Sequence, residues 1–183
     1  LIGIPAAFVE KARALIEGLT FVPGDNVMIS ATHSHTGPEM GGRVKGVEQK
    51  AEAALRRWHN GLPGLIANAV KAAEENLQPV EMSTAIATEE SVSFIRRFKM
   101  VDGSVGWNPG KLNPKIVAPV GTIDPSIPVI VFDAPGGAAR KRPLATFVNF
   151  ANHLDTVGGA DFSADYPYTL ARVLDDARGA GHM

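Results

Sequence analysis

The first 31 residues carry a helix pattern, a turn and a short apolar run, and this order constrains the fold more than any other feature. Pro5 suits the first turn of a helix, and apolar residues then recur at helical spacing as far as Leu19. Residues 23–26 predict a turn, and residues 27–31 predict a short buried strand. A helix, a turn and a strand in succession form half of an α/β unit, in which ligands bind beyond the carboxyl ends of the strands.

The rest of the chain continues to alternate between helix and strand patterns. Five of the 13 prolines lie within residues 107–128, which predicts an ordered loop because proline cannot occupy a central strand or a helix interior. We expect an α/β fold, with a mixed β-sheet flanked by helices, in a single domain across residues 1–183. Because the chain begins in mid-pattern, we also expect it to be an incomplete portion of a larger domain. The predicted elements are helices at 47–76 (broken at 60–61) and 166–177, and strands at 80–87, 91–100, 127–132 and 144–151.

The composition is that of an ordinary globular protein and excludes several classes of partner. With 45% hydrophobic residues and a formal net charge of -1, the chain has no basic excess for binding nucleic acid or an anionic membrane. No apolar run approaches the roughly 20 residues that a transmembrane helix needs. The chain contains no cysteine, so thiolate ligands and nucleophiles are excluded. Composition sets neither the oligomeric state nor the compartment.

Histidines at the ends of two apolar runs are the strongest indication of chemistry. His33 and His35 flank Ser34 just after the first run, and His153 follows an apolar run at 146–151. Side chains at i and i+2 of an extended segment point the same way, so His33 and His35 can face one cavity. Imidazole is a good ligand for zinc. The pattern therefore favours a metal site, although a hydrogen-bonded turn histidine fits the same pattern.

Other polar residues have less specific patterns. Asp155 follows His153 closely and either orients a ligand imidazole or caps a loop. Asp165 is first a candidate helix cap. Arg96 and Arg97 alternate faces on a predicted strand, so one of them can point into a cleft, and Arg96 is our candidate for substrate binding. Two further histidines receive no catalytic role: His59 beside Trp58, expected to be a surface or packing residue, and the terminal His182.

Five short blocks resemble the neutral/alkaline (non-lysosomal) ceramidase family, in matching order over nearly the whole chain. Residues 30–38 (SATHSHTGP) resemble its S-A-T-H-T-H-S-G-P signature. Residues 94–98 are similar to its N-R-R segment and residues 121–125 to its G-x-x-D-P segment. Residues 149–153 and 163–167 resemble its F-x-x-H and S-A-D-Y-P blocks. The first and last blocks are specific, whereas the middle ones are weak alone.

The resemblance implies a zinc-dependent amidohydrolase that cleaves the N-acyl bond of ceramide into a fatty acid and a sphingoid base. It implies that His33 and His153 are ligands of one Zn²⁺, that His35 is a catalytic partner, and that a Glu and a Tyr beyond this chain complete the site. It also suggests a secreted or periplasmic protein. Ile95 and Tyr168 depart from the family pattern, and residues 155–159 are closer to shorter bacterial relatives of uncertain substrate. The resemblance therefore supports amide hydrolysis as the reaction more strongly than ceramide as the substrate.

Three functions fit these sequence features. The first is hydrolysis of an N-acyl amide by metal-activated water, with His35 and Asp155 as catalytic residues and a small-molecule or lipid amide as substrate. The second is a catalytically silent relative that binds a lipid or a glycan on the same scaffold. A metal hydrolase acting on a phosphate or sugar ester is the weakest, because two-metal sites usually need more nearby aspartates.

Overall fold

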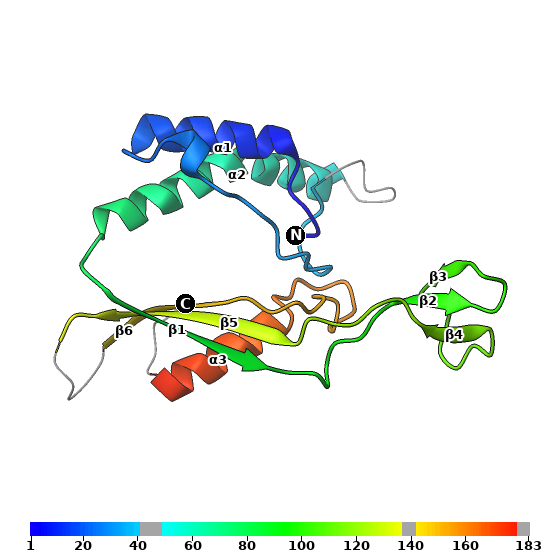
Figure 1. Cartoon of the computed structure of the whole chain (residues 1–183). Helices are drawn as coiled ribbons and strands as arrows, with labels where there is room; N and C mark the ends of the chain where they lie inside the picture. Colours follow the sequence, from blue (N-terminus) through cyan, green and yellow to red (C-terminus); the bar gives the residue numbers. More distant parts are fainter. Residues whose placement is uncertain (41–48, 137–141, 179–183) are drawn as a thin grey trace. The chain divides into compact units, whose positions relative to one another are not determined.

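The computed structural model describes residues 1–40, 49–136 and 142–178 (Figure 1). The chain divides into two compact units, one formed by Leu1–Val80 with His153–His182 and the other by Glu81–Asn152. The expectation of a single domain across residues 1–183 stays a prediction. The first unit contains α1 (Ala6–Leu19), η1 (Gly24–Asn26), α2 (Gln49–Glu75) and α3 (Tyr166–Arg178).

Helix α1 forms as the sequence predicts and packs against α2 (Figure 1). Pro5 stands at its N-cap with an extended backbone, which fits the fixed φ of proline. Ala12 and Ile16, one turn apart, are fully buried, and so is Ala67 of α2. The 3.6-residue period of the apolar residues therefore produces the small core of this unit.

Helix α2 continues through the break that the sequence predicts at residues 60–61. Asn60, Gly61 and Pro63 all lie inside the helix. Proline removes one helical hydrogen bond, but Pro63 is almost fully buried, so packing compensates for the loss. The predicted break is therefore wrong. Residues 47 and 48 of the predicted helix lie outside the described residues.

The strand predicted at residues 27–31 is also wrong. The segment is irregular, although its exposure alternates as in a strand: Val27 and Ile29 are half-buried and Met28 is 88% exposed. The Arg13 side chain donates from Nε to the backbone oxygen of Val27 at 2.8 Å. An extended segment becomes a strand only when a neighbouring strand takes its backbone groups, and within the described residues this segment has no such neighbour.

The second unit contains a three-stranded sheet in the order β1-β5-β6. All its pairings are antiparallel, with Thr84 opposite Ile130 and Ile130 opposite Phe147. The central strand, β5, is less exposed than β1 because it has a neighbouring strand on each side. All residues of β1 are exposed. These strands agree with the predicted positions to within a few residues. Their bounds are Glu81–Thr88 for β1, Ser126–Ala134 for β5 and Arg142–Val148 for β6.

A smaller antiparallel sheet has the order β3-β2-β4. A turn at Asp102 and Gly103 joins β2 to β3, and Gly103 adopts a φ of 81° that glycine tolerates without strain. The strand predicted at 91–100 is shorter than expected. The ordered loop expected at residues 107–128 is wrong in part, because the segment contains the edge strand β4 and the first residues of the central strand β5, where Pro128 lies opposite Ile86. The bounds are Arg97–Met100 for β2, Val105–Trp107 for β3 and Ile116–Pro119 for β4.

The expected combination of helices and strands is confirmed, with two small antiparallel sheets in place of one mixed sheet. All strand pairs among the described residues are antiparallel, and the segment expected to begin an α/β unit does not pair there. None of the helices in the described part of the chain is long and apolar enough to cross a bilayer.

Candidate metal centre

Residues 33–36 form a turn whose side chains divide between two environments. Ser34 and Thr36 are buried, at 6% and 8% exposure, whereas His33 and His35 are exposed. The expected i, i+2 relationship of the two histidines therefore holds. It arises in a turn rather than a strand, and His33 adopts a φ of 64°. The two imidazoles share the open side of the loop.

Hydrogen bonds from this turn hold a distant part of the chain beside it. Thr36 donates from Oγ1 to the backbone oxygen of Ser163 at 2.9 Å, and the Ser163 N–H donates to the Thr36 oxygen at 3.1 Å. The His35 N–H donates to the backbone oxygen of Leu154 at 3.2 Å. Since Leu154 directly follows His153, the last contact brings the third histidine to the other two.

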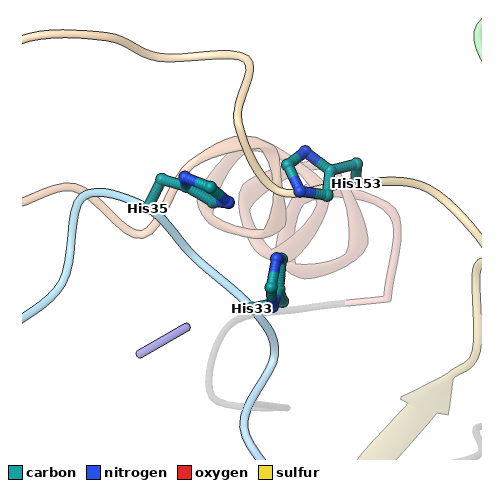
Figure 2. A group of neighbouring side chains, drawn as sticks. All are labelled: His33, His35 and His153. Carbon is teal, nitrogen blue, oxygen red and sulfur yellow. The ribbon is translucent and has the colours of Figure 1, made fainter. Parts of the chain in front are cut away.

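The rings of His33, His35 and His153 face one another (Figure 2). The ring centroids are 5.0 Å apart for His33 and His35, 5.0 Å for His33 and His153, and 4.8 Å for His35 and His153. One nitrogen from each ring lies within 4.8 Å of the others, so the cluster could hold a metal ion. The predicted approach of His33 to His153 is therefore confirmed. Neither residue directly follows a paired strand: His153 is five residues beyond β6.

His33 is held with a defined nitrogen available for a metal. Its Nδ1 lies 2.8 Å from the backbone oxygen of Ile2. Because a carbonyl oxygen can only accept, Nδ1 carries the proton and donates it. Nε2 then has the free lone pair. A ring nitrogen that donates to a carbonyl is the usual arrangement of a histidine that binds a metal through its other nitrogen.

Asp155 lies near His35. The distance from His35 Nδ1 to Asp155 Oδ2 is 3.9 Å, and both side chains are partly exposed. A carboxylate near Nδ1 favours the tautomer in which Nδ1 is protonated and Nε2 is directed elsewhere. At 3.9 Å the two groups are too far apart for a direct hydrogen bond, and the two roles open to Asp155 stay predictions.

Arg96 lies in the second unit, where its guanidinium stacks over Trp107. The Arg96 Cζ is 4.9 Å from the centre of the Trp107 ring, a cation–π distance. Arg97 begins β2 and is exposed. The structure thus gives Arg96 a partner within its own unit, and its predicted role in substrate binding stays a prediction.

Asp165 has a larger structural role than the helix cap expected from the sequence. Its carboxylate does accept from the N–H of Tyr166, at 2.7 Å, at the start of α3. It also accepts from the Thr156 hydroxyl and from the N–H groups of Thr156 and Val157, at 2.5, 2.9 and 3.1 Å. Burial raises the pKa of Asp165, but these hydrogen bonds outweigh it and lower the pKa from 3.8 to about 2.

The sequence offered no signal for these additional bonds. A cap residue is recognised from its immediate neighbours, whereas Thr156 lies nine positions earlier in an irregular segment. Asp165 also adopts a φ of 58°, a conformation in which aspartate is one of the few tolerated residues.

An apolar cavity of about 700 Å³ lies next to the His33–His35 turn. Gly37 and Pro38, which directly follow the turn, form one part of its wall. Its remaining lining includes Ala54, Leu55 and Trp58 of α2 and Phe162, which precedes Ser163. Chain neighbours of the residues that hold the histidines therefore border a cavity with the chemistry of a hydrocarbon-binding site.

The other two histidines lie apart from the cluster or outside the described residues. His59 packs against Phe8 and Trp58, with ring centroids 5.9 and 5.4 Å away, and its Nε2 is 2.6 Å from the Glu39 oxygen. The expected packing role of His59 is confirmed. His182 lies outside the described residues.

Comparisons with known proteins find no matching family model, no matching curated protein and no matching solved structure. The geometry alone therefore defines the class of site, a three-histidine group able to hold a metal ion.

The lowered pKa of Asp165 predicts a pH-dependent stability. The folded protein favours the charged carboxylate, so Asp165 stabilises the fold above pH 3.8 and loses this contribution as the pH falls toward 2. The shift corresponds to about 2 kcal/mol. We expect the difference in unfolding free energy between wild type and Asp165→Asn, measured by urea denaturation, to shrink by most of this amount from about pH 6 to about pH 2.5.

Asp161, exposed on the same loop, provides the matched control. The Asp161→Asn variant should follow the pH dependence of the wild type. A difference between wild type and Asp165→Asn that stays constant with pH would contradict the prediction.

Proposed function

We propose that the chain is part of a zinc-dependent hydrolase of N-acyl amide bonds, with His33 and His153 as zinc ligands. The convergence of three imidazoles from two distant segments is the observation that carries the proposal. The resemblance of residues 30–38, 149–153 and 163–167 to blocks of neutral ceramidases supports amide hydrolysis as the reaction. A long-chain acyl amide such as ceramide is the proposed substrate.

The cluster fits a zinc site by its chemistry and by its spacing, with His33 and His153 as two of the protein ligands and His35 beside them. Neutral imidazole nitrogens are preferred zinc ligands, and three protein ligands with an open position are typical of catalytic sites. Zinc–nitrogen bonds of about 2.0–2.1 Å in a tetrahedral site place ligand nitrogens about 3.4 Å apart. Small side-chain rotations, which the exposed His33 and His35 can make, would reduce the observed limit of 4.8 Å to this value. The exposure of His33 and His35 leaves the site accessible.

Zinc, when bound, supplies Lewis-acid chemistry that lowers the pKa of water from 15.7 toward about 7 and polarises an amide carbonyl. The residues of the chain have separate tasks. His33 presents Nε2 because Ile2 fixes its Nδ1 proton. In this proposal His35, with Asp155 near its Nδ1, transfers a proton through Nε2 to the leaving amine. Water adds to the carbonyl carbon as the C–N bond breaks, giving a carboxylic acid and an amine.

The apolar cavity supports a substrate with a long hydrocarbon chain. Its border at Gly37 and Pro38 lies directly after the histidine turn, so a chain bound there ends close to the proposed reaction centre. Each buried methylene contributes about 0.8 kcal/mol to binding. Lipid amides are therefore favoured over short, polar amides.

The metal site is tested by measuring zinc affinity in competition with a chromogenic chelator. His33→Ala and His153→Ala should each weaken zinc binding by more than about 100-fold, because each removes a ligand. His59→Ala, which removes a histidine outside the cluster, should bind zinc as the wild type does. Unchanged affinity in both ligand variants would rule out this site.

His35→Gln separates proton transfer from metal binding. In the longest natural polypeptide that contains the chain, this variant should retain zinc and lose about 10²–10⁴-fold in kcat. Loss of zinc would instead make His35 a ligand. Zinc binding without hydrolysis of any N-acyl amide, in the unmodified polypeptide, would favour the alternative of a catalytically silent lipid- or glycan-binding protein.

The cavity is tested by filling it. Ala54→Phe should raise the KM for a long-chain N-acyl amide by about tenfold or more, since excluding two buried methylenes has an effect of this size. Hydrolysis of a short-chain amide should be unaffected. The control is Ala53→Phe, which changes the neighbouring residue outside the cavity lining. Equal effects of Ala54→Phe on long-chain and short-chain substrates would contradict the assignment of the cavity.

A further inference from the structure

We infer that Asp165 is a positioning residue for the histidine cluster: its carboxylate ties the segment that carries His153 to the residues that hold the His33–His35 turn. The inference rests on the proposed metal site and adds a residue that does not itself face the metal. It is carried by the hydrogen bonds that join Asp165 to both parts of the site.

The carboxylate of Asp165 is a buried junction. The residue is only 4% exposed, and both of its oxygens accept two hydrogen bonds. One donor, the Tyr166 N–H, belongs to the start of α3. The other three belong to Thr156 and Val157, so a helix cap alone accounts for only a quarter of the bonds.

The bonds to Thr156 and Val157 anchor the segment after His153 at one end. The other end is held by Leu154, whose backbone oxygen accepts from the His35 N–H. The position of the His153 ring therefore depends on the bond at Leu154, before Asp155, and on the bonds at Thr156 and Val157, after it. Removing the carboxylate removes the contacts at Thr156 and Val157 and leaves the bond at Leu154 in place.

A second set of bonds connects Asp165 to the His33–His35 turn. The Asp165 N–H donates to Ser163 Oγ at 3.0 Å. The backbone of Ser163 in turn pairs with Thr36, through the two bonds described above, and its oxygen also accepts from Ser34 Oγ at 3.4 Å. Asp165 thus lies between the two segments that supply the three rings.

Loss of the carboxylate should release the His153 segment rather than unfold the protein. Thr156 and Val157 are exposed, so their N–H groups can bond to water when Asp165 no longer accepts from them. The segment after His153 then loses one of the two anchors described above. Asparagine at position 165 preserves the size of the side chain, but its NH₂ group meets N–H donors and repels them.

The experiment compares Asp165→Asn with two control variants of the 183-residue chain. Asp161→Asn changes an exposed aspartate of the same loop, and Ala171→Gly destabilises α3 without touching the hydrogen bonds of Asp165. Two quantities are measured on folded protein. The first, measured on the metal-free protein, is the nuclear Overhauser effect between the ring of His153 and the rings of His33 and His35. The second is the affinity for zinc.

We expect Asp165→Asn to lose the ring-to-ring effects and to bind zinc about 10–100-fold more weakly, as removal of a group that supports ligands typically does. Both controls should retain both properties. Unchanged ring contacts in Asp165→Asn would overturn the inference, and so would an equal loss in Ala171→Gly. If the wild type shows the ring contacts but binds no zinc, the proposed function fails while the metal-free measurement still decides the role of Asp165.

Discussion

The contact between residues 34–36 and residues 154–163 is the constraint on which the histidine cluster depends. These stretches are more than 100 residues apart, and α2 and the whole second unit lie between them in the chain. Ser34 and Thr36 point inward to the backbone of Ser163, and this forces His33 and His35 to the opposite side. Each bond contributes about 1 kcal/mol, so the arrangement is stable because several bonds form together.

Local sequence patterns predicted most helices and strands, whereas contacts between distant residues determined which strands paired and where a helix continued. The apolar period of residues 8–19 predicts α1 because helix formation and burial depend on the same spacing. Residues 27–31 have the composition of a strand, but a strand needs a partner, which no local pattern specifies. Likewise, Asn60 and Gly61 indicated a break that the burial of Pro63 prevents. One mixed sheet was expected from the order of the elements, but that order does not specify which strands pair.

For the site, sequence spacing predicted the pair, and a second apolar run together with the resemblance predicted the third member. The i, i+2 rule placed His33 and His35 on one side, correctly, although the backbone reaches this result through a turn with positive φ at His33. His153 was grouped with them because it also follows an apolar run, and the family blocks assigned it to the same Zn²⁺ as His33. The wider role of Asp165 was not predictable because its partners Thr156 and Val157 lie in a segment without periodic pattern.

The central claim is that imidazoles from both segments bind one zinc ion. X-ray absorption at the zinc edge, measured on the zinc-loaded chain, reports the ligands directly. The account predicts at least two imidazole nitrogens at about 2.0–2.1 Å, with the outer-ring scattering of histidine, and loss of that scattering when the cluster histidines are replaced. A spectrum with oxygen ligands only would contradict it.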